Sequence, residues 1–441
     1  MSHRRFAVRL VLLSCTALLL MVPVSGFESV RPEPRPWKAA RSVVVTTAAE
    51  LVAALSGDTG DLTIFVQRGT YLLDHAIHVP DQTTLIGEGE MLYDDVGLPT
   101  GFVPESRTVI AAIPGVTGDF VTLGDGASLQ GLVIQDIARP AITGGVVVMV
   151  SSQGPGLSVS AQIVESEIIN PNPTGATTTG PTGRGLSAMT RNSSLSVGGV
   201  GHDQSVVSVN LTSSIIRSLA PSGADGVFVV NFASESQINL HLRQNVVGRL
   251  TANGGVSRPS STVGSRVSIQ SMGNLYRPET ATTSSGWVFN GGSDAPIAGQ
   301  IAQETLNNNL SMHSVDDRIE GFGRAISATA ALRMSALAGA ISSNGLELIL
   351  EGTRLASTTS DLQLFGARSV PVGVAAGDNN ELRVTMHGVT GSGPRTNTYG
   401  NALSDLGVDN RLVISGSLMA FTHTNDAILP MPGEQFFTGG R

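Results

Sequence analysis

The sequence predicts an all-β chain that folds as a single parallel β-helix, a solenoid of stacked coils with one short helix over its first coil. Apolar residues alternate over runs of four to six residues, which is the period of a β-strand. Several of these runs recur 29 to 36 residues apart, and no ten-residue amphipathic helix separates them. Asn-Gly and Asp-Gly hairpin signals are few, so each strand has to pair with the next coil.

Residues 1–26 are predicted to be an export signal peptide. Three arginines precede the apolar run from Leu10 to Val22, and a cleavage site after Gly26 fits the small residues there. The run is too short to favour a permanent membrane span. Cys15 leaves a lipoprotein anchor open as an alternative. We therefore expect a secreted, periplasmic or cell-envelope protein with no membrane span after signal removal.

Composition excludes several classes of protein and site. Cys15 is the only cysteine, so the mature chain has no disulfide and no thiolate metal site. The net charge of −8, without a basic stripe, argues against nucleic acid as a partner. Apolar residues make up 41% of the chain, which is not a disordered composition. Lys38 is the only lysine, so no mechanism inside the folded body uses a lysine base.

A Pro-rich linker over 27–42 is predicted to lead into a short capping helix. Thr47 and Glu50 have the spacing of a capping box, and Gly57 ends the helix. Its apolar face is formed by Leu51, Ala54 and Leu55.

The β-helix is predicted to occupy 43–430, followed by a C-terminal tail over 431–441. The first strands are expected at 62–66, 76–79 and 83–86. A pattern of apolar residues at alternate positions, which we call the repeated phrase, then recurs at 156–159, 194–197, 207–211, 238–242, 267–269, 346–348, 382–384 and 412–414. About 30 residues per coil gives some 13 coils and a rod of roughly 60 Å. The Ala-rich segment 324–341 is expected to form small-residue strands, and Asn307-Asn308-Asn309 a turn or a side-chain ladder.

The segment from Thr47 to Gly89 resembles the N-terminus of pectin-lyase-like right-handed parallel β-helix proteins. The resemblance is carried by the short helix, by Gly69-Thr70-Tyr71 and by Leu85-Ile86-Gly87-Glu88-Gly89. Residues 119–134 also resemble the sequence pattern of single coils in that group of proteins. The resemblance implies a right-handed coil but no reaction, because this fold carries lyases, hydrolases, epimerases, adhesins and passive surface proteins.

Asp316-Asp317-Arg318 resembles the paired aspartates of polygalacturonase-type hydrolases of this fold. Such enzymes use one carboxyl as an acid and one to activate water. The Gly-His-Gly motif that should follow is matched only by Gly201-His202-Asp203, which lies upstream and lacks the second glycine. Asp316 and Asp317 are thus candidate catalytic residues, and a solvated turn is the alternative.

Calcium-dependent lyase chemistry is the second enzymatic possibility, because Arg277-Pro278 echoes the arginine motif of pectate lyases. Calcium would need clustered carboxylates, and Asp119, Asp125 and Asp136 are too closely spaced to establish a shared face. Turn stabilisation is the alternative for them. No HExxH or comparable zinc spacing occurs, so the histidines are interpreted as non-ligands and no metal site is assigned.

Two further patterns concern the surface. Tyr276, Trp287 and Phe289 fall within one coil length, which makes Tyr276 and Trp287 the candidate binding patch for a sugar. Glu165 and Glu167 alternate, so both are expected to point outward from one strand.

Two hypotheses of function follow. The first is a non-catalytic extracellular or envelope protein that contacts a polysaccharide or a cell surface. The second is a polysaccharide lyase or glycoside hydrolase acting on an acidic polysaccharide. A groove in which three or more carboxylates or arginines converge would favour the enzyme.

Overall fold

The computed structural model describes most of the chain from residue 41 onward. The described residues are 41–57, 61–136, 145–170, 184–193, 195, 199–218, 225–258, 260–279, 282–294, 303–335, 339–370, 374, 377–391, 398–402, 409–416, 427–428 and 436–438. The predicted signal peptide and nearly all of the predicted linker lie outside this range, and the following paragraphs concern the described residues.

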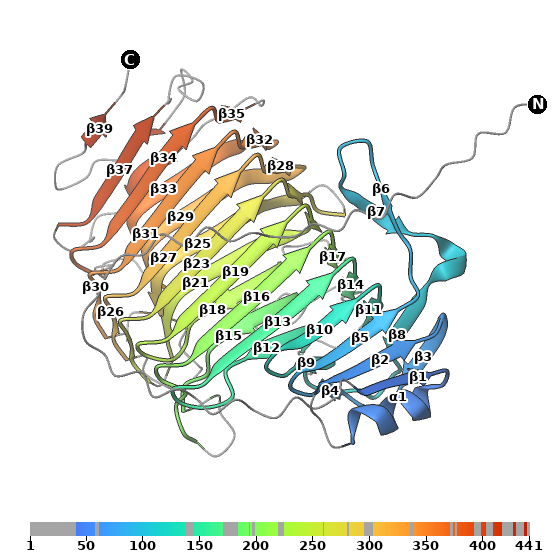
Figure 1. Ribbon diagram of the computed structural model, residues 1–441. Coiled ribbons are helices and arrows are strands. Elements are labelled where there is room, and N and C mark those ends of the chain that lie inside the picture. The colour runs from blue at the N-terminus through green and yellow to red at the C-terminus, as the bar shows by residue number, and fades with distance from the viewer. Residues whose placement is uncertain are drawn as a thin grey trace, which may run out of the picture. The chain divides into compact units, whose positions relative to one another are not determined.

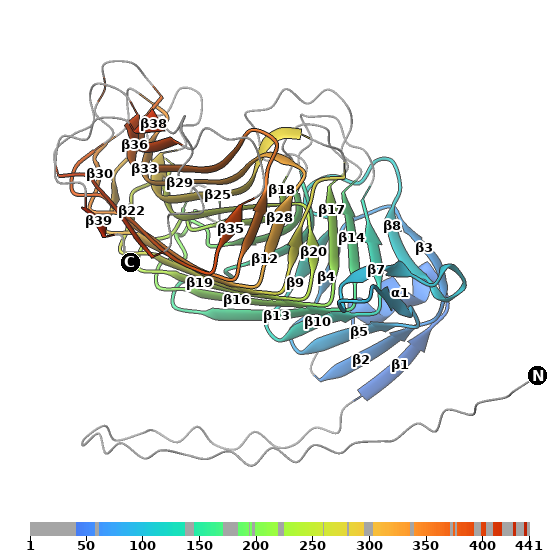
Figure 2. The same cartoon turned by 90° about the horizontal axis from the view of Figure 1, so that it is seen from above.

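Three long sheets of parallel strands make up the fold, and each runs along the stack of coils (Figures 1 and 2). Sheet A has thirteen strands: β1 (Arg41–Val45), β2 (Leu62–Val66), β5 (Thr83–Gly87), β10 (Ala127–Gln130), β13 (Ser158–Val164), β16 (Val206–Thr212), β19 (Gln237–Arg243), β23 (Arg266–Met272), β27 (Asn309–Val315), β31 (Gly345–Glu351), β34 (Glu381–His387), β37 (Arg411–Gly416) and β39 (Phe436–Thr438).

The other two long sheets contain fewer strands. Sheet B has ten strands: β3 (Gly69–Leu73), β8 (Thr108–Ala112), β11 (Val133–Gln135), β14 (Glu167–Asn170), β17 (Ile215–Ser218), β20 (Val246–Val247), β24 (Leu275–Tyr276), β28 (Arg318–Glu320), β32 (Arg354–Ala356) and β35 (Thr390–Gly391). Sheet C has eleven: β4 (Ile77–Val79), β9 (Val121–Leu123), β12 (Val146–Ser151), β15 (Arg184–Met189), β18 (Asp225–Val230), β21 (Arg249–Ser257), β25 (Thr282–Asp294), β29 (Phe322–Arg333), β33 (Ser360–Ser369), β36 (Thr398–Ala402) and β38 (Ala427–Ile428).

Several smaller elements lie outside the three long sheets. A three-stranded parallel sheet contains β22 (Thr262–Val263), β26 (Thr305–Leu306) and β30 (Ile341–Ser342). The antiparallel hairpin of β6 (Met91–Tyr93) and β7 (Pro99–Phe102) leads into η1, a 3-10 turn at Pro104–Ser106. Met91 and Phe102 of this hairpin pack with Val133 and Ile215 of sheet B, so the hairpin covers part of that sheet.

Each coil passes through sheet A, then sheet B, then sheet C, and returns to sheet A. The sequence separation of paired residues gives the coil length, which is 21 residues from Leu62 to Thr83 but 48 from Ser158 to Val206. The strands stay in register because the insertions lie between them. Every repeated phrase predicted from 207 onward lies on a strand of sheet A, whereas 194–197 lies mostly outside the described residues.

From β10 onward, sheet A turns into sheet B through a two-residue corner. The first corner residue has a positive φ, for example 45° at Glu165, 53° at Gln244 and 54° at Asp316. The left-handed conformation reverses the chain within one residue, and glycine takes this position at Gly273 and Gly352. The second corner residue points inward and is buried, as at Asn245 and Asp317.

The buried corner residues form hydrogen-bonded ladders along the stack. Asn245 donates its backbone N–H to Asn274 Oδ1 at 2.8 Å, and Asn274 donates its own to Asp317 Oδ1 at 2.8 Å. A second ladder at the entrance to sheet A joins Asn308 N–H to Asn344 Oδ1 at 3.1 Å, and continues through Asn380 and Asn410. The ladders satisfy backbone groups that the turn removes from the sheets. The predicted Asn307–Asn309 ladder is confirmed at Asn308.

The predicted capping helix is confirmed as α1 (Ala48–Leu55), which lies at the end of the stack that carries β1 (Figure 1). Thr47 Oγ1 accepts from Glu50 N–H at 3.2 Å, and Glu50 Oε2 accepts from Thr47 N–H at 3.2 Å. Leu51 and Leu55 are buried in the main core cluster. The helix thereby covers apolar side chains of the first coil.

The fold class predicted from the sequence is confirmed: the chain is an all-β right-handed parallel β-helix with a short N-terminal helix. The Ala-rich segment forms strand β29, as expected. Strand β39 lies within the residues predicted to be a C-terminal tail and pairs with β37. None of the described residues forms a helix that is long and apolar enough to cross a membrane.

Candidate functional site

The two aspartates singled out as a catalytic pair lie on different sides of the backbone. Asp316 is exposed at the left-handed corner position, whereas Asp317 is buried within the ladder. Asp317 Oδ1 accepts from Asn274 N–H and Oδ2 accepts from the Ser314 hydroxyl at 2.7 Å. Burial raises the pKa of Asp317 from its usual 3.8 to about 6, against the opposing effect of these donors. The two carboxyl groups therefore do not share an open face, and their catalytic role stays a prediction.

The aromatic candidates do come together, but inside the coil. Tyr276 and Trp287 pack edge to face with ring centroids 5.0 Å apart, and Trp287 lies 5.6 Å from Phe289. Tyr276 and Trp287 are both fully buried. Their rings fill the core where a polysaccharide cannot reach them. Sequence spacing located the cluster correctly but not the direction in which its side chains point.

The carboxylates considered for calcium have backbone partners. Asp125 Oδ1 accepts from Ser160 N–H and from the Ser160 hydroxyl, both at 2.9 Å, and Asp119 Oδ1 accepts from Val146 N–H at 3.1 Å. Both contacts stabilise turns between coils. Among the described residues, no three His, Cys, Asp or Glu side chains gather as a metal-binding group. Calcium binding stays a prediction.

Glu165 and Glu167 do not alternate on one strand, so that interpretation is wrong. The corner lies between them: Glu165 has a φ of 45°, and Glu167 begins β14. Glu167 is only 2% exposed and accepts from Arg217 Nε at 2.7 Å. Arg217 also donates to Glu279, and both line a hollow of about 500 Å³ beside Arg277 and hairpin β6–β7. These charges pair mainly with one another.

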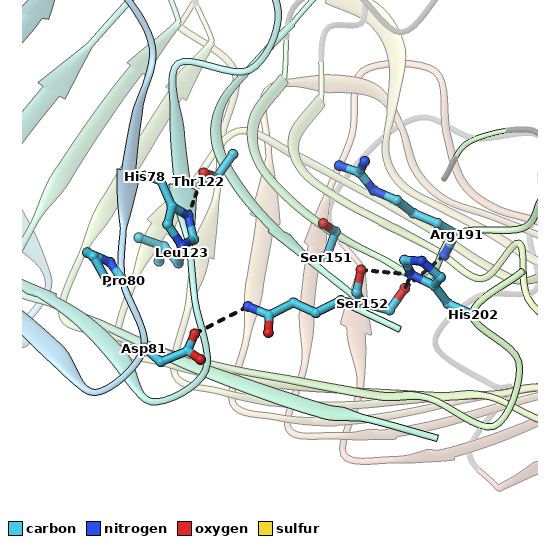
Figure 3. A pocket seen from close by; sticks show the side chains of 10 residues that line it. His78, Pro80, Asp81, Thr122, Leu123, Ser151, Ser152, Arg191 and His202 are labelled. Carbon is cyan, nitrogen blue, oxygen red and sulfur yellow. Dashed lines mark hydrogen bonds between the residues drawn. The ribbon is translucent and has the colours of Figure 1, made fainter. Parts of the chain in front are cut away.

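A groove of about 640 Å³ at the turn between sheets C and A is the best candidate site (Figure 3). We call it the sheet C groove. It collects side chains from β4, β9, the residues that follow β12, and the segment after β15. Its polar groups are His78, Asp81, Ser152, Gln153, Arg191 and His202.

His202 is held in one orientation by Ser152. Its Nδ1 lies 2.9 Å from the Ser152 carbonyl oxygen and 2.9 Å from the Ser152 hydroxyl (Figure 3). A carbonyl oxygen only accepts, so Nδ1 carries the proton and Nε2 of the neutral ring is an acceptor. No described residue contacts that Nε2, which leaves it available to a ligand hydroxyl.

His78 presents a similar arrangement at the other end of the groove. It projects outward from β4, where Ile77 and Val79 point into the core. Its Nδ1 lies 3.0 Å from Thr122 Oγ1 on the next coil, and the Thr122 hydroxyl reaches the Ile77 carbonyl at 3.5 Å. This geometry favours donation from His78 Nδ1 to Thr122, with Nε2 as an acceptor.

Arg191 supplies the positive charge of the groove. Its backbone N–H donates to the Ser152 hydroxyl at 3.0 Å, which fixes the start of the side chain. Its Nε is buried and has no hydrogen-bond partner. A buried donor without a partner is unfavourable, and this Nε is closed to solvent, so a ligand would meet the other donors of the guanidinium group.

Asp81 is the only carboxylate among the described residues that line the groove. Its Oδ1 accepts from Asp125 N–H at 2.8 Å and from Gln153 Nε2 at 3.3 Å. No second carboxylate is among the described residues that line the groove, whereas glycosidases use two. The groove therefore provides acceptors at His78, His202 and Asp81 and a donor at Arg191, but not a pair of carboxylates.

Sequence reasoning missed this site. In the sequence, Gly201-His202-Asp203 matches only part of a hydrolase motif, and the histidines, His78 among them, are interpreted as non-ligands. A polar residue between two inward apolar residues, as in Ile77-His78-Val79, shows that the side chain faces outward. The groove itself combines segments separated by up to 124 residues, which no local pattern connects.

Three parallel sheets, left-handed corners with an inward ladder and a capping helix define the class of protein. The chain is a right-handed parallel β-helix protein, which is the fold that the N-terminal resemblance implied. No protein-family model matches the sequence, and no curated protein matches it either.

Solved structures with similar folds include viral, enzymatic and adhesive proteins. Tailspike protein 2 of Escherichia coli O157:H7 bacteriophage CAB120 is 11% identical, with a TM-score of 0.39, over 86% of this chain and 43% of the tailspike. A polygalacturonase from Erwinia carotovora has the same identity and TM-score, over 86% of this chain and 99% of the enzyme. A surface adhesin of Streptococcus pneumoniae is 11% identical, with a TM-score of 0.28, over 83% of this chain and 86% of the adhesin. Likenesses of this size transfer no activity.

Proposed function

We propose that this chain is a non-catalytic polysaccharide-binding protein of the extracellular space or cell envelope, and that the sheet C groove holds the saccharide. One observation carries the proposal. The groove offers oriented hydrogen-bonding groups of both kinds, with a single carboxylate and no aromatic platform. Saccharide hydroxyls donate and accept, so they match the ring nitrogens of His78 and His202 and the guanidinium of Arg191.

The location outside the cytoplasm rests on the predicted signal peptide. A solvent-exposed groove suits a polymer, because the units that do not fit the groove can stay in solvent. The rigid backbone of the stacked coils keeps the hydrogen-bonding groups in place before the ligand arrives, which lowers the entropic cost of binding.

The proposal is tested by measuring binding and product formation with the same panel of neutral and acidic polysaccharides. Affinity gel electrophoresis measures binding, while reducing ends and ultraviolet-absorbing unsaturated products report cleavage. We expect at least one polymer to be retarded without product formation. Arg191→Ala should weaken that binding about 10- to 100-fold, because hydrogen bonds to charged groups contribute about 1.5–3 kcal/mol.

Arg354→Ala is the matched control, since Arg354 is an exposed arginine of sheet B outside the groove. It should bind as the unmodified protein does. Cleavage products that disappear in Asp316→Asn and Asp317→Asn would instead establish the hydrolase or lyase hypothesis. Equal binding by the Arg191 and Arg354 variants would place the saccharide elsewhere.

A further inference from the structure

The outer face of sheet A is a regular surface with no part in the groove. Its strands pair residue for residue from β13 to β37, and the register continues without a shift from each strand to the next. Alternate residues of each strand are buried, as in the Gln237–Arg243 strand, so the remaining residues face outward. Residues in register on successive strands therefore form straight outward rows along the stack.

The central outward row consists of uncharged hydrogen-bonding side chains over six successive coils. Paired register places them in the order Ser128, Gln162, Asn210, His241, Gln270 and His313. The adjacent outward row is uncharged as well over five coils: Ser160, Ser208, Asn239, Ser268 and Ser311. Together they make a flat band of hydroxyl, amide and imidazole groups.

Contacts along the band show that its side chains line up from coil to coil. His241 Nδ1 lies 3.1 Å from Gln270 Oε1, and Asn239 Nδ2 donates to Ser208 Oγ at 3.2 Å. The band contains a hollow with a volume of about 380 Å³. Its lining includes Asn210, His241, Gln270 and His313 of the central row, with Met272 beside them. Met272 is 50% exposed, so the hollow has an apolar wall beside its polar row.

We propose that this band is a second binding surface, separate from the sheet C groove, for an extended uncharged polysaccharide that lies along the stack of coils. Its rows repeat once per coil, about every 4.8 Å, which is comparable to the advance of an extended chain of pyranose rings. Amide, hydroxyl and imidazole groups both donate and accept, as sugar hydroxyls do. The apolar wall formed by Met272 suits the C–H face of a ring.

The charge of the band selects among possible polymers. None of the eleven residues of the two rows carries a permanent charge; His241 and His313 are the titratable ones, and His313 Nε2 lies 3.4 Å from Glu351 Oε1 on the next strand. Among the described residues lining the hollow, Arg243 alone has a permanent charge. An acidic polymer or a nucleic acid would find no row of cations to pair with its repeating charges. An uncharged polysaccharide has no charged groups that would have to give up their hydration on binding. It is therefore the occupant that the band favours.

The test measures binding of the full chain to soluble hydroxyethyl cellulose and to a series of β-1,4-linked gluco-oligosaccharides of increasing length. The triple variant Asn210→Ala/Gln270→Ala/His313→Ala removes three exposed side chains from the row, so it leaves the core intact. We expect it to lose at least tenfold in affinity for the polymer. Affinity of the unmodified chain should rise with oligosaccharide length, because each added sugar reaches another coil.

Two controls separate this surface from the groove and from changes in folding. Thr70→Ala/Arg354→Ala/Thr390→Ala removes three exposed side chains of sheet B and should bind hydroxyethyl cellulose normally. Arg191→Ala should also bind it normally, so failure of the groove proposal leaves this one standing. Unchanged binding by the row variant, no binding by the unmodified chain, or equal competition by polygalacturonate would overturn the proposal.

Discussion

At the scale of single residues, Asp317 occupies a ladder position that Asn245 and Asn274 fill on the two preceding coils. Its Oδ1 accepts from Asn274 N–H and Nδ2, just as Asn274 Oδ1 accepts from Asn245 N–H and Nδ2. An asparagine Nδ2 also donates to a strand carbonyl, as Asn274 does to Leu242 at 3.1 Å. A carboxylate cannot make that last bond and must also lose its hydration.

Asp317→Asn should therefore stabilise the protein above pH 6. The folded pKa of about 6 lies above the usual 3.8, so the folded state binds the proton more tightly than the unfolded chain does. The contribution of Asp317 to the free energy of unfolding is largest below pH 4 and falls by about 3 kcal/mol as pH rises to 6. Chemical denaturation at a series of pH values measures the difference between the variant and the unmodified protein.

Asp316→Asn is the control for this prediction, because Asp316 is exposed and asparagine tolerates its left-handed conformation. It should change stability little at any pH. A stability difference for Asp317→Asn that stays constant from pH 4 to pH 8 would contradict the raised pKa. A loss of stability at pH 8 would show that the ladder needs the carboxylate.

At the scale of elements, α1 combines a local start signal with a non-local packing surface. The Thr47–Glu50 capping box satisfies N–H groups at the helix start, which contributes about 1 kcal/mol. A helix of 8 residues is too short to be stable by itself, so the burial of Leu51 and Leu55 on the first coil has to hold it in place.

Leu51→Ala should loosen the first coils without unfolding the whole stack. Replacing a buried leucine with alanine costs roughly 2–5 kcal/mol, and here the loss falls at one end of a solenoid. Hydrogen exchange followed by mass spectrometry should show faster exchange in β1, β2 and β5, with later coils unchanged. Ala53→Gln, on the exposed side of α1, should leave exchange as it was. Uniformly faster exchange in all coils would contradict a local capping role.

At the scale of the whole β-helix, each coil touches mainly its two neighbours, and the ladders connect them continuously. Asn308 links three coils: its Oδ1 accepts from Ser265 N–H, while its Nδ2 donates to the Thr262 carbonyl and to Asn344 Oδ1. Stability in such a stack is a sum of coil and interface contributions, so a weak interface divides it into separately melting parts.

Asn308→Ala should split the thermal unfolding transition. It leaves Ser265 N–H and the Thr262 carbonyl buried without a partner, at about 1–3 kcal/mol each. Calorimetry should then show two transitions, or one broadened transition at a lower temperature. Asn307→Gly is the neighbouring control, because φ at Asn307 is 56° and glycine adopts that conformation without strain. A single sharp transition unchanged by Asn308→Ala would contradict a stack held by its ladder.

The sequence by itself determined most strands of sheet A and the helix with its capping box, and it gave a ladder at Asn307–Asn309 as one of two alternatives. Each of these depends on short-range chemistry: alternation of apolar residues, reciprocal caps three residues apart, and small amide side chains at tight corners. The length of the predicted β-helix, divided by about 30 residues per coil, predicts some 13 coils, and sheet A has thirteen strands among the described residues.

Only the tertiary structure decided which side chains reach solvent together. Asp317 and Trp287 turn inward because of where the corner and the strand place them, while His78, Arg191 and His202 meet in one groove. Coil lengths vary from 21 to 48 residues, so distance along the chain does not give the position along the stack. The register between strands sets that position, and it arises only when the backbones of successive coils pair.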